Sequence, residues 1–257
     1  TGHGATSILA NRSPTLVSLP VTPFLSQKFR FWSFVSMFLL VFVHGYNLEM
    51  RYLQPWSTPM EPMTPTAFLE YLFANGLFRF RIPMLFIISG YLFALHDDQP
   101  HEQRVKKRLR TLGLPYLIWS GLAIALTFAL ELHPYTRAII IDSLVVQIDD
   151  TRMLLHDYRW YELTFRWILL PVSYQLWFIR VLLIYNLAYP WIRQAVLGKI
   201  SRPIFFTIAT LLWMGTMGFV FFEGEGLLFF SLGVWIQKTG FSVEQPKGWM
   251  NPVGWFI

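Results

Sequence analysis

The sequence predicts an all-α membrane protein: a polytopic bundle of about six transmembrane helices. Hydrophobic residues make up 54% of the 257-residue chain, and charged residues only 14%. A soluble protein would carry about a quarter charged residues. Long apolar segments also alternate with clusters of Lys and Arg, the pattern of helices that cross a bilayer and end in basic loops. Cysteine is absent, which excludes disulfides, thiolate nucleophiles and cysteine-based metal or haem sites.

The first half of the chain divides into a leader and three predicted helices. Residues 1–27 are polar and contain prolines, so they predict a flexible leader to a membrane domain over 28–257. A proline-rich loop is expected after the first helix, and a solvent-side loop over 96–110 after the second. The predicted helices cover 29–48, 77–95 and 112–131.

The second half predicts three further helices, within 164–190 with a break at Pro171, over 204–222 and over 227–237. The apolar segment 138–148 is too short to span and is expected at the interface or against the bundle. The cations are densest in 104–110, so we expect this segment and the N-terminus on the cytoplasmic side. Membrane topology thus explains the net charge of +6, and nucleic-acid binding is not indicated.

The first helix carries the main candidate for chemistry. Arg30 and His44 are separated by about 21 Å of helix without a charged residue, and both lie within about 40° of one face. His44 is a candidate general base, because a neutral imidazole can take a proton from a hydroxyl. The alternative is a helix-end histidine bonded to a backbone carbonyl or lying at the interface. No second His lies three or four residues away, so no metal site is expected.

Two arginines precede the second helix. Arg79 and Arg81 point to opposite sides of a helix, and either can hold an anion or a carbonyl oxygen inside the bundle. The alternative is that both extend to the outer interface. Within the same helix, Ser89 and Gly90 form a small pair that lets a neighbouring helix come close.

The basic segment 104–110 is a candidate polyphosphate site, since Arg forks and Lys charges both suit phosphate. Its alternative role is a topology signal in contact with lipid headgroups. No Gly-rich phosphate loop occurs, so the sequence does not support an ATP-driven mechanism. Further along, Arg180 lies in an apolar helix, where a charge needs a partner or water, and with Trp177 it is a candidate substrate contact. The alternative for Trp177 is an interface aromatic.

Together these segments resemble the acyltransferase 3 family of integral membrane enzymes, which usually transfer acetyl groups to sugars. The resemblance extends from residue 28 over most of the chain, and the order of its motifs is more specific than any single one. They are the first helix ending in His44, PMLFIISGYLFAL at 83–95, RVKKRLR followed by LPY at 114–116, LWFIRVLLIYNLAYP at 176–190 and FFSLGVWIQK at 229–238. The likeness implies an acyl-CoA (acetyl-CoA) co-substrate, a carbohydrate acceptor, contact with membrane lipids and a bacterial inner-membrane location.

The resemblance also implies site residues. It assigns the catalytic role to His44 alone; in a mechanism consistent with the residues and the resemblance, Arg79 or Arg81 would stabilise charge on the carbonyl oxygen. The donor would contact Arg30, Lys107, Arg108 and Arg110, and no permanently bound cofactor is expected. Members usually place an arginine eleven positions before the histidine, where this chain has Ser33, so Arg30 substitutes one turn away. Members have about ten helices, which implies a missing C-terminal portion or a short form.

Two other classes of function remain open at this stage. In a transporter or flippase, the arginines Arg79, Arg81 and Arg180 would line a polar path for an anionic substrate. In a non-catalytic member, the chain would only bind a partner. Stabilisation by an acyl-CoA, lost when Lys107, Arg108 and Arg110 are neutralised, would distinguish the enzyme from both.

Overall fold

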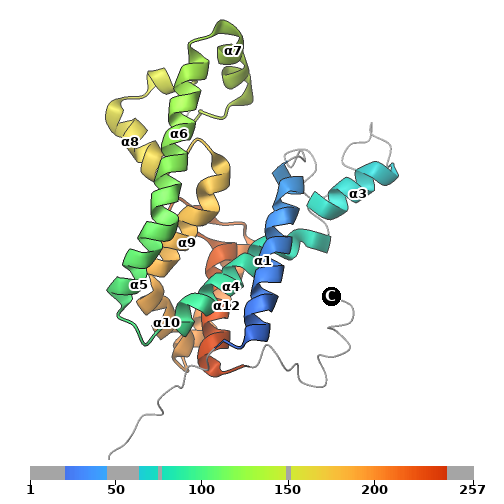
Figure 1. Ribbon diagram of the computed structural model, residues 1–257, viewed down its shortest axis with the longest axis vertical. Helices are drawn as coiled ribbons and strands as arrows, with labels where there is room; N and C mark the ends of the chain where they lie inside the picture. Colours follow the sequence, from blue (N-terminus) through green and yellow to red (C-terminus); the bar gives the residue numbers. More distant parts are fainter. Residues whose placement is uncertain (1–20, 45–63, 75–76, 149–151, 242–257) are drawn as a thin grey trace, which may run out of the picture.

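The computed structural model describes residues 21–44, 64–74, 77–148 and 152–241, and these form helices with one short hairpin (Figure 1). The first half contains α1 (Pro23–His44), α3 (Pro65–Ala74), the 3₁₀ turn η1 (Leu77–Phe80), α4 (Arg81–Leu95), α5 (His101–Arg108), the π-helical turn η2 (Leu109–Gly113) and α6 (Leu114–Glu131). The second half contains α7 (Pro134–Ser143), η3 (Leu155–Asp157), α8 (Trp160–Ile168), η4 (Tyr174–Leu176), α9 (Trp177–Leu187), α10 (Tyr189–Leu197), α11 (Ser201–Met214), β1 (Gly218–Phe219), β2 (Phe222–Glu223) and α12 (Gly224–Thr239).

Helices α4 and α12 form the closest pair, and glycines make the approach possible. A methyl group on Gly90 of α4 would lie 2.1 Å from the carbonyl oxygen of Phe230, and one on Gly233 of α12 would lie 2.1 Å from that of Ile87. Small residues allow this backbone contact, and the dispersion energy of the contact stabilises helix packing where apolar surroundings provide no hydrophobic driving force. The prediction that Gly90 admits a neighbouring helix is therefore confirmed.

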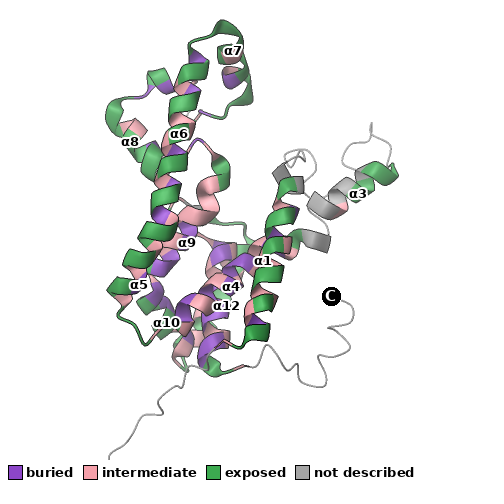
Figure 2. Ribbon diagram, in the orientation of Figure 1, coloured by how far each residue is buried: buried purple, intermediate pink, exposed green. Residues whose placement is uncertain are grey.

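The main core surrounds this pair. Buried side chains from α4, α9, α10 and α12 pack together, and they account for most of the buried residues in the lower part of Figure 2. Helix α1 crosses α4, with the Phe29 and Tyr91 rings 5.1 Å apart. The largest fully buried members of the core are Phe86, Val181, Tyr189, Val196, Phe230 and Val234.

A second, smaller core lies at the far end of α6. It contains Ile140, Val146, Leu154, Leu155, Tyr158 and Val172. The buried carboxylate of Glu131 accepts hydrogen bonds from the backbone N–H groups of Leu155 (2.6 Å) and His156 (3.2 Å), and lies 2.5 Å from Nδ1 of His156. These contacts fasten the η3 turn to the end of α6.

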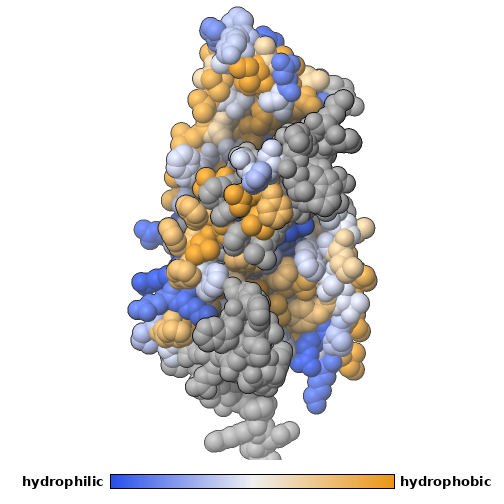
Figure 3. All heavy atoms as spheres, turned by 90° about the vertical axis from the view of Figure 1, so that its right-hand side faces the viewer, coloured by the Kyte–Doolittle hydropathy of each residue, from blue (hydrophilic) through white to orange (hydrophobic). Residues whose placement is uncertain are grey.

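One continuous helix, His101–Glu131, is long and apolar enough to cross a membrane within the part of the chain that the structure describes. Counting α10 and α11 as one span, although they are bent by 117°, gives a second candidate. The all-α prediction is confirmed, whereas this test does not confirm six spanning helices. On the face shown in Figure 3, hydrophobic surface extends over the middle of the molecule, and the two largest hydrophilic groups lie in the lower half.

Several predicted boundaries change. The supposed loop over 96–110 is helical from His101, because its Glu, Gln, Lys, Arg and Leu residues favour helix whatever their charge. The prediction of a fifth helix over 204–222 is wrong beyond Met214, where a turn and hairpin at 215–223 follow the helix. Helix α1 starts at Pro23, inside the predicted leader, and α12 extends over Gly224–Thr239. The break near Pro171 is confirmed, between α8 and α9.

Candidate functional site

The residue at the centre of the basic end is Asp97, in the turn after α4. Its carboxylate lies 3.0 Å from Nη2 of Arg104, 2.8 Å from Nε of Arg193 and 2.7 Å from Nζ of Lys238. Burial opposes ionisation of this carboxyl, but the hydrogen bond and charge of Lys238, with Tyr189 and Arg193, hold its pKa below the usual value. One anion thus joins α5, α10 and α12 to the end of α4 and leaves an excess of positive charge.

Arg104 is buried and holds α5 against α4. Its Nη1 donates to the carbonyl oxygen of Phe93 at 3.0 Å, and its guanidinium lies 4.7 Å from the Phe93 ring and 4.8 Å from the Tyr189 ring. The hydrogen bond satisfies a carbonyl that the end of α4 would otherwise leave unpaired. Arg104 is therefore a structural cation, and the side chains that follow it on α5 are available for a ligand.

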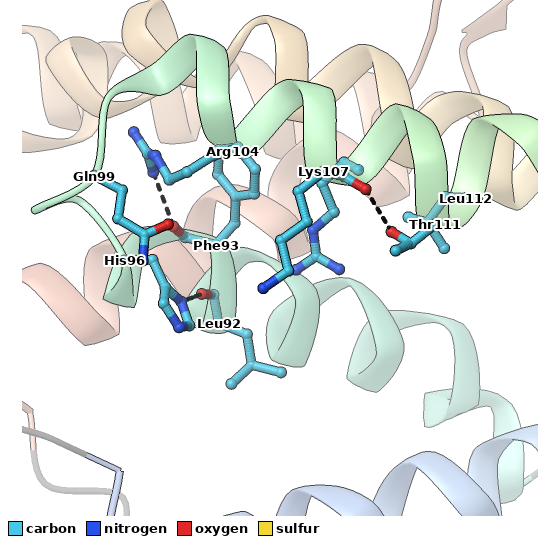
Figure 4. A pocket seen from close by; sticks show the side chains of 9 residues that line it. Leu92, Phe93, His96, Gln99, Arg104, Lys107, Thr111 and Leu112 are labelled. Carbon is cyan, nitrogen blue, oxygen red and sulfur yellow. Dashed lines mark hydrogen bonds between the residues drawn. The ribbon is translucent and has the colours of Figure 1, made fainter.

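A cavity of about 330 Å³ opens between α4 and the α5–η2 segment (Figure 4). Figure 4 shows Lys107 reaching from α5 toward α4, with Arg104 and Phe93 to its left and Leu92 below. The predicted donor residues Lys107 and Arg108 both line this cavity, but Arg110 does not. The complete lining is Leu92, Phe93, His96, Gln99, Arg104, Lys107, Arg108, Thr111 and Leu112. Arg104 is engaged by Asp97 and Phe93, so Lys107 and Arg108 are the cations that this cavity offers to a ligand, and they suit phosphate groups.

A second cavity, of about 350 Å³, lies between α1 and α4. The predicted donor residue Arg30 lines this cavity rather than the basic one. It also contains Ser33, at the position where the resemblance led us to look for an arginine. The complete lining is Val21, Ser26, Phe29, Arg30, Ser33, Ile88 and Leu92.

A charged cluster lies at the other end of α4. Arg81 is buried and Arg79 is exposed, and both interact electrostatically with the carboxylate of Glu225 on α12. Glu223 is adjacent and caps α12 by accepting hydrogen bonds from the backbone N–H groups of Glu225 (3.1 Å) and Gly226 (2.6 Å). The two predicted arginines therefore share one cluster with an acid that the sequence did not single out.

The remaining candidates are placed as follows. His44 is the last residue of α1, and its side chain lies outside the described part of the structure. Trp177 begins α9 and packs against Phe86, with 6.4 Å between ring centroids. Arg180 donates a hydrogen bond to the carbonyl oxygen of Leu169, so it joins α9 to the end of α8. The contact of Trp177 and Arg180 with substrate stays a prediction.

Sequence reasoning missed Asp97, Lys238 and Glu225. An aspartate directly after an apolar helix, just ahead of a basic segment, was a usable signal for an ion pair with Arg104. No sequence pattern links Asp97 to Lys238, however, because they lie 141 positions apart and only the packing of α4 on α12 brings them together. The same packing places Glu225 near Arg79 and Arg81.

Comparison with known proteins gives two matches. The family model described as "Acyltransferase domain" matches residues 34–249. The "Succinoglycan biosynthesis protein ExoH" of Rhizobium meliloti (strain 1021) is 25% identical over 216 residues, which cover 83% of this chain and 54% of that protein. The chain thus spans about half the length of this curated relative. No solved structure matches.

Proposed function

Since the chain belongs to the acyltransferase 3 family, we propose that it acts in transferring an acyl group from an acyl-CoA to a hydroxyl of a carbohydrate. The observation that supports the proposal is the cavity between α4 and α5, where Lys107 and Arg108 lie beside the buried Arg104 and supply cations suited to phosphate groups. An acetyl donor and a cell-surface or exported polysaccharide are the substrates we favour, the latter because the relative is named for succinoglycan biosynthesis.

The chemistry assigned to the site needs a base, a donor and charge stabilisation. His44 takes the proton of the acceptor hydroxyl, whose oxygen attacks the thioester carbonyl carbon. The carbon–sulfur bond breaks, and the coenzyme A thiolate leaves and is protonated from the histidine. Arg79 or Arg81 stabilises the negative charge that develops on the carbonyl oxygen. Arg30 and His44, about 21 Å apart along α1, mark the distance between the donor end and the acceptor end.

The proposal also includes a membrane location and an orientation. The chain is embedded in a bacterial inner membrane with about six spans, and its basic end faces the cytoplasm, where acyl-CoA is made. A flippase is the competing function. It is less well supported, because Arg180 donates a hydrogen bond to the Leu169 carbonyl oxygen and joins α9 to the end of α8, which is a structural role.

Binding of acetyl-CoA to the purified protein tests the donor site. A Lys107→Gln/Arg108→Gln double variant should bind at least about tenfold more weakly, because one hydrogen bond to a charged group is worth about 1.5–3 kcal/mol. The matched control is Lys199→Gln/Arg202→Gln, which removes two cations that line neither cavity. Equal affinity in the double variant and the control would refute the donor site.

A further inference from the structure

The two cavities meet at one residue. Leu92, near the end of α4, lines both the basic cavity and the cavity between α1 and α4. Figure 4 shows its side chain leaving α4 on the side where α1 passes, whereas Lys107 approaches from α5. The two spaces are similar in volume, about 330 and 350 Å³, and Leu92 is the residue that their linings share.

The cavities differ in charge. The basic cavity carries three cations, Arg104, Lys107 and Arg108, and the second carries only Arg30. Apart from Arg30, the second cavity offers apolar side chains and two hydroxyls, those of Ser26 and Ser33. It therefore suits an uncharged chain with a few polar groups and does not suit a polyphosphate.

An acyl-CoA molecule likewise has one charged part and one uncharged part. Its nucleotide end carries the phosphates, and its pantetheine arm is an uncharged chain of methylene and amide groups that ends in the thioester. Building on the function proposed above, we propose that the donor occupies both cavities and bends at Leu92, with its phosphates at Lys107 and Arg108 and its arm between α1 and α4. Leu92 is then a positioning residue, since it directs the arm without touching the reacting atoms.

The direction of the arm is indicated by Ser36. This side chain is fully buried in α1, one turn beyond Ser33, and its hydroxyl has no hydrogen-bond partner among the described residues. A buried hydroxyl without a partner is costly, which is explained if a ligand supplies the acceptor. Ser36 lines neither cavity, so an arm that enters past Arg30 and Ser33 reaches it by continuing along α1, about 12 Å of helix before His44.

The test compares two probes on the purified chain: coenzyme A and adenosine bisphosphate, its phosphate-bearing half. We expect coenzyme A to bind the unmodified protein at least about tenfold more tightly, the equivalent of burying about two methylene groups. Leu92→Trp fills the junction and should abolish this advantage, because the bulkier ring blocks the passage from one cavity to the other. Leu95→Trp, one turn along α4 and lining neither cavity, is the matched control and should leave both affinities unchanged.

A second variant makes the test independent of the folding of Leu92→Trp. Ser33→Phe fills the second cavity from the α1 side and should abolish the advantage of coenzyme A, while the affinity for adenosine bisphosphate stays within about twofold, because Ser33 does not line the basic cavity. Equal binding of the two probes to the unmodified protein, or a parallel loss of both in the variants, would overturn the two-cavity site while leaving the basic cavity as a phosphate site. Failure of both probes to bind the unmodified protein would instead overturn the proposed donor site itself.

Discussion

Replacing Asp97 with Asn should destabilise the protein by about 4 kcal/mol. The change removes the one carboxylate that three cations share. The side chains of Arg104 and Lys238, which are only 8% and 5% exposed, then lack an anionic partner at this position. Removing one partner of a buried ion pair costs about 3–5 kcal/mol. Arg193 adds at most about 1 kcal/mol, because its side chain is 45% exposed and water can solvate it.

Chemical unfolding in detergent micelles, followed by tryptophan fluorescence, measures this difference. The matched control is Asp98→Asn, which makes the same chemical change at the exposed neighbouring position. An Asp97→Asn protein within about 1 kcal/mol of the Asp98→Asn protein would refute the view that Asp97 joins α4, α5, α10 and α12.

The same carboxylate predicts a pH dependence. The pKa of Asp97 is lower in the folded protein than the unfolded value of about 3.9, because Lys238, Tyr189 and Arg193 outweigh the effect of burial. Its contribution is therefore fully present above about pH 4 and is lost as the pH falls through the folded value. As the pH is lowered below about 4, the free energy of unfolding should fall more steeply for the unmodified protein than for Asp97→Asn. Parallel curves of unfolding free energy against pH would contradict the stabilising role of the Asp97 carboxylate.

Two further changes test the packing. Gly90→Ala places a methyl group 2.1 Å from the carbonyl oxygen of Phe230 and should lower the free energy of thermal unfolding by at least about 2 kcal/mol. The control is Gly113→Ala, whose added methyl group has its nearest contact at 3.5 Å and should change the stability little. Equal stability of the two variants would contradict the close pairing of α4 and α12. Glu131→Gln should speed hydrogen exchange at the amide of Leu155 about tenfold, and an unchanged rate would contradict the attachment of η3 to α6.

Local features of the fold were predictable because they depend on neighbouring residues. Gly90 within an apolar run predicts close helix packing, and Pro171 predicts a break, since neither inference needs a distant partner. The segment 101–110 shows the limit of this reasoning. Its charges indicated a solvated surface, which holds for Lys106, Lys107 and Arg110 but not for the buried Arg104. Charge does not determine conformation, and helix-favouring residues make the segment the start of the long helix that includes α6.

The site was only partly predictable for a related reason. Lys107 and Arg108 were predicted because they belong to one continuous basic segment, and Arg30 because of its spacing from His44; the structure places them in the linings of two cavities, and their contact with a donor stays a prediction. The assembly around Asp97 depends on Arg193 and Lys238, which come from helices late in the chain. Such contacts follow from the packing of α10 and α12 on α4, which no local pattern in the sequence encodes.

The most direct test of the central claim is acyl transfer by membranes that contain the protein, with labelled acetyl-CoA as donor and a carbohydrate as acceptor. His44→Ala, at the same expression level, should abolish transfer while acetyl-CoA binding persists, because His44 ends α1 whereas the proposed donor residues Lys107 and Arg108 lie on α5. Full transfer activity in His44→Ala would contradict the account.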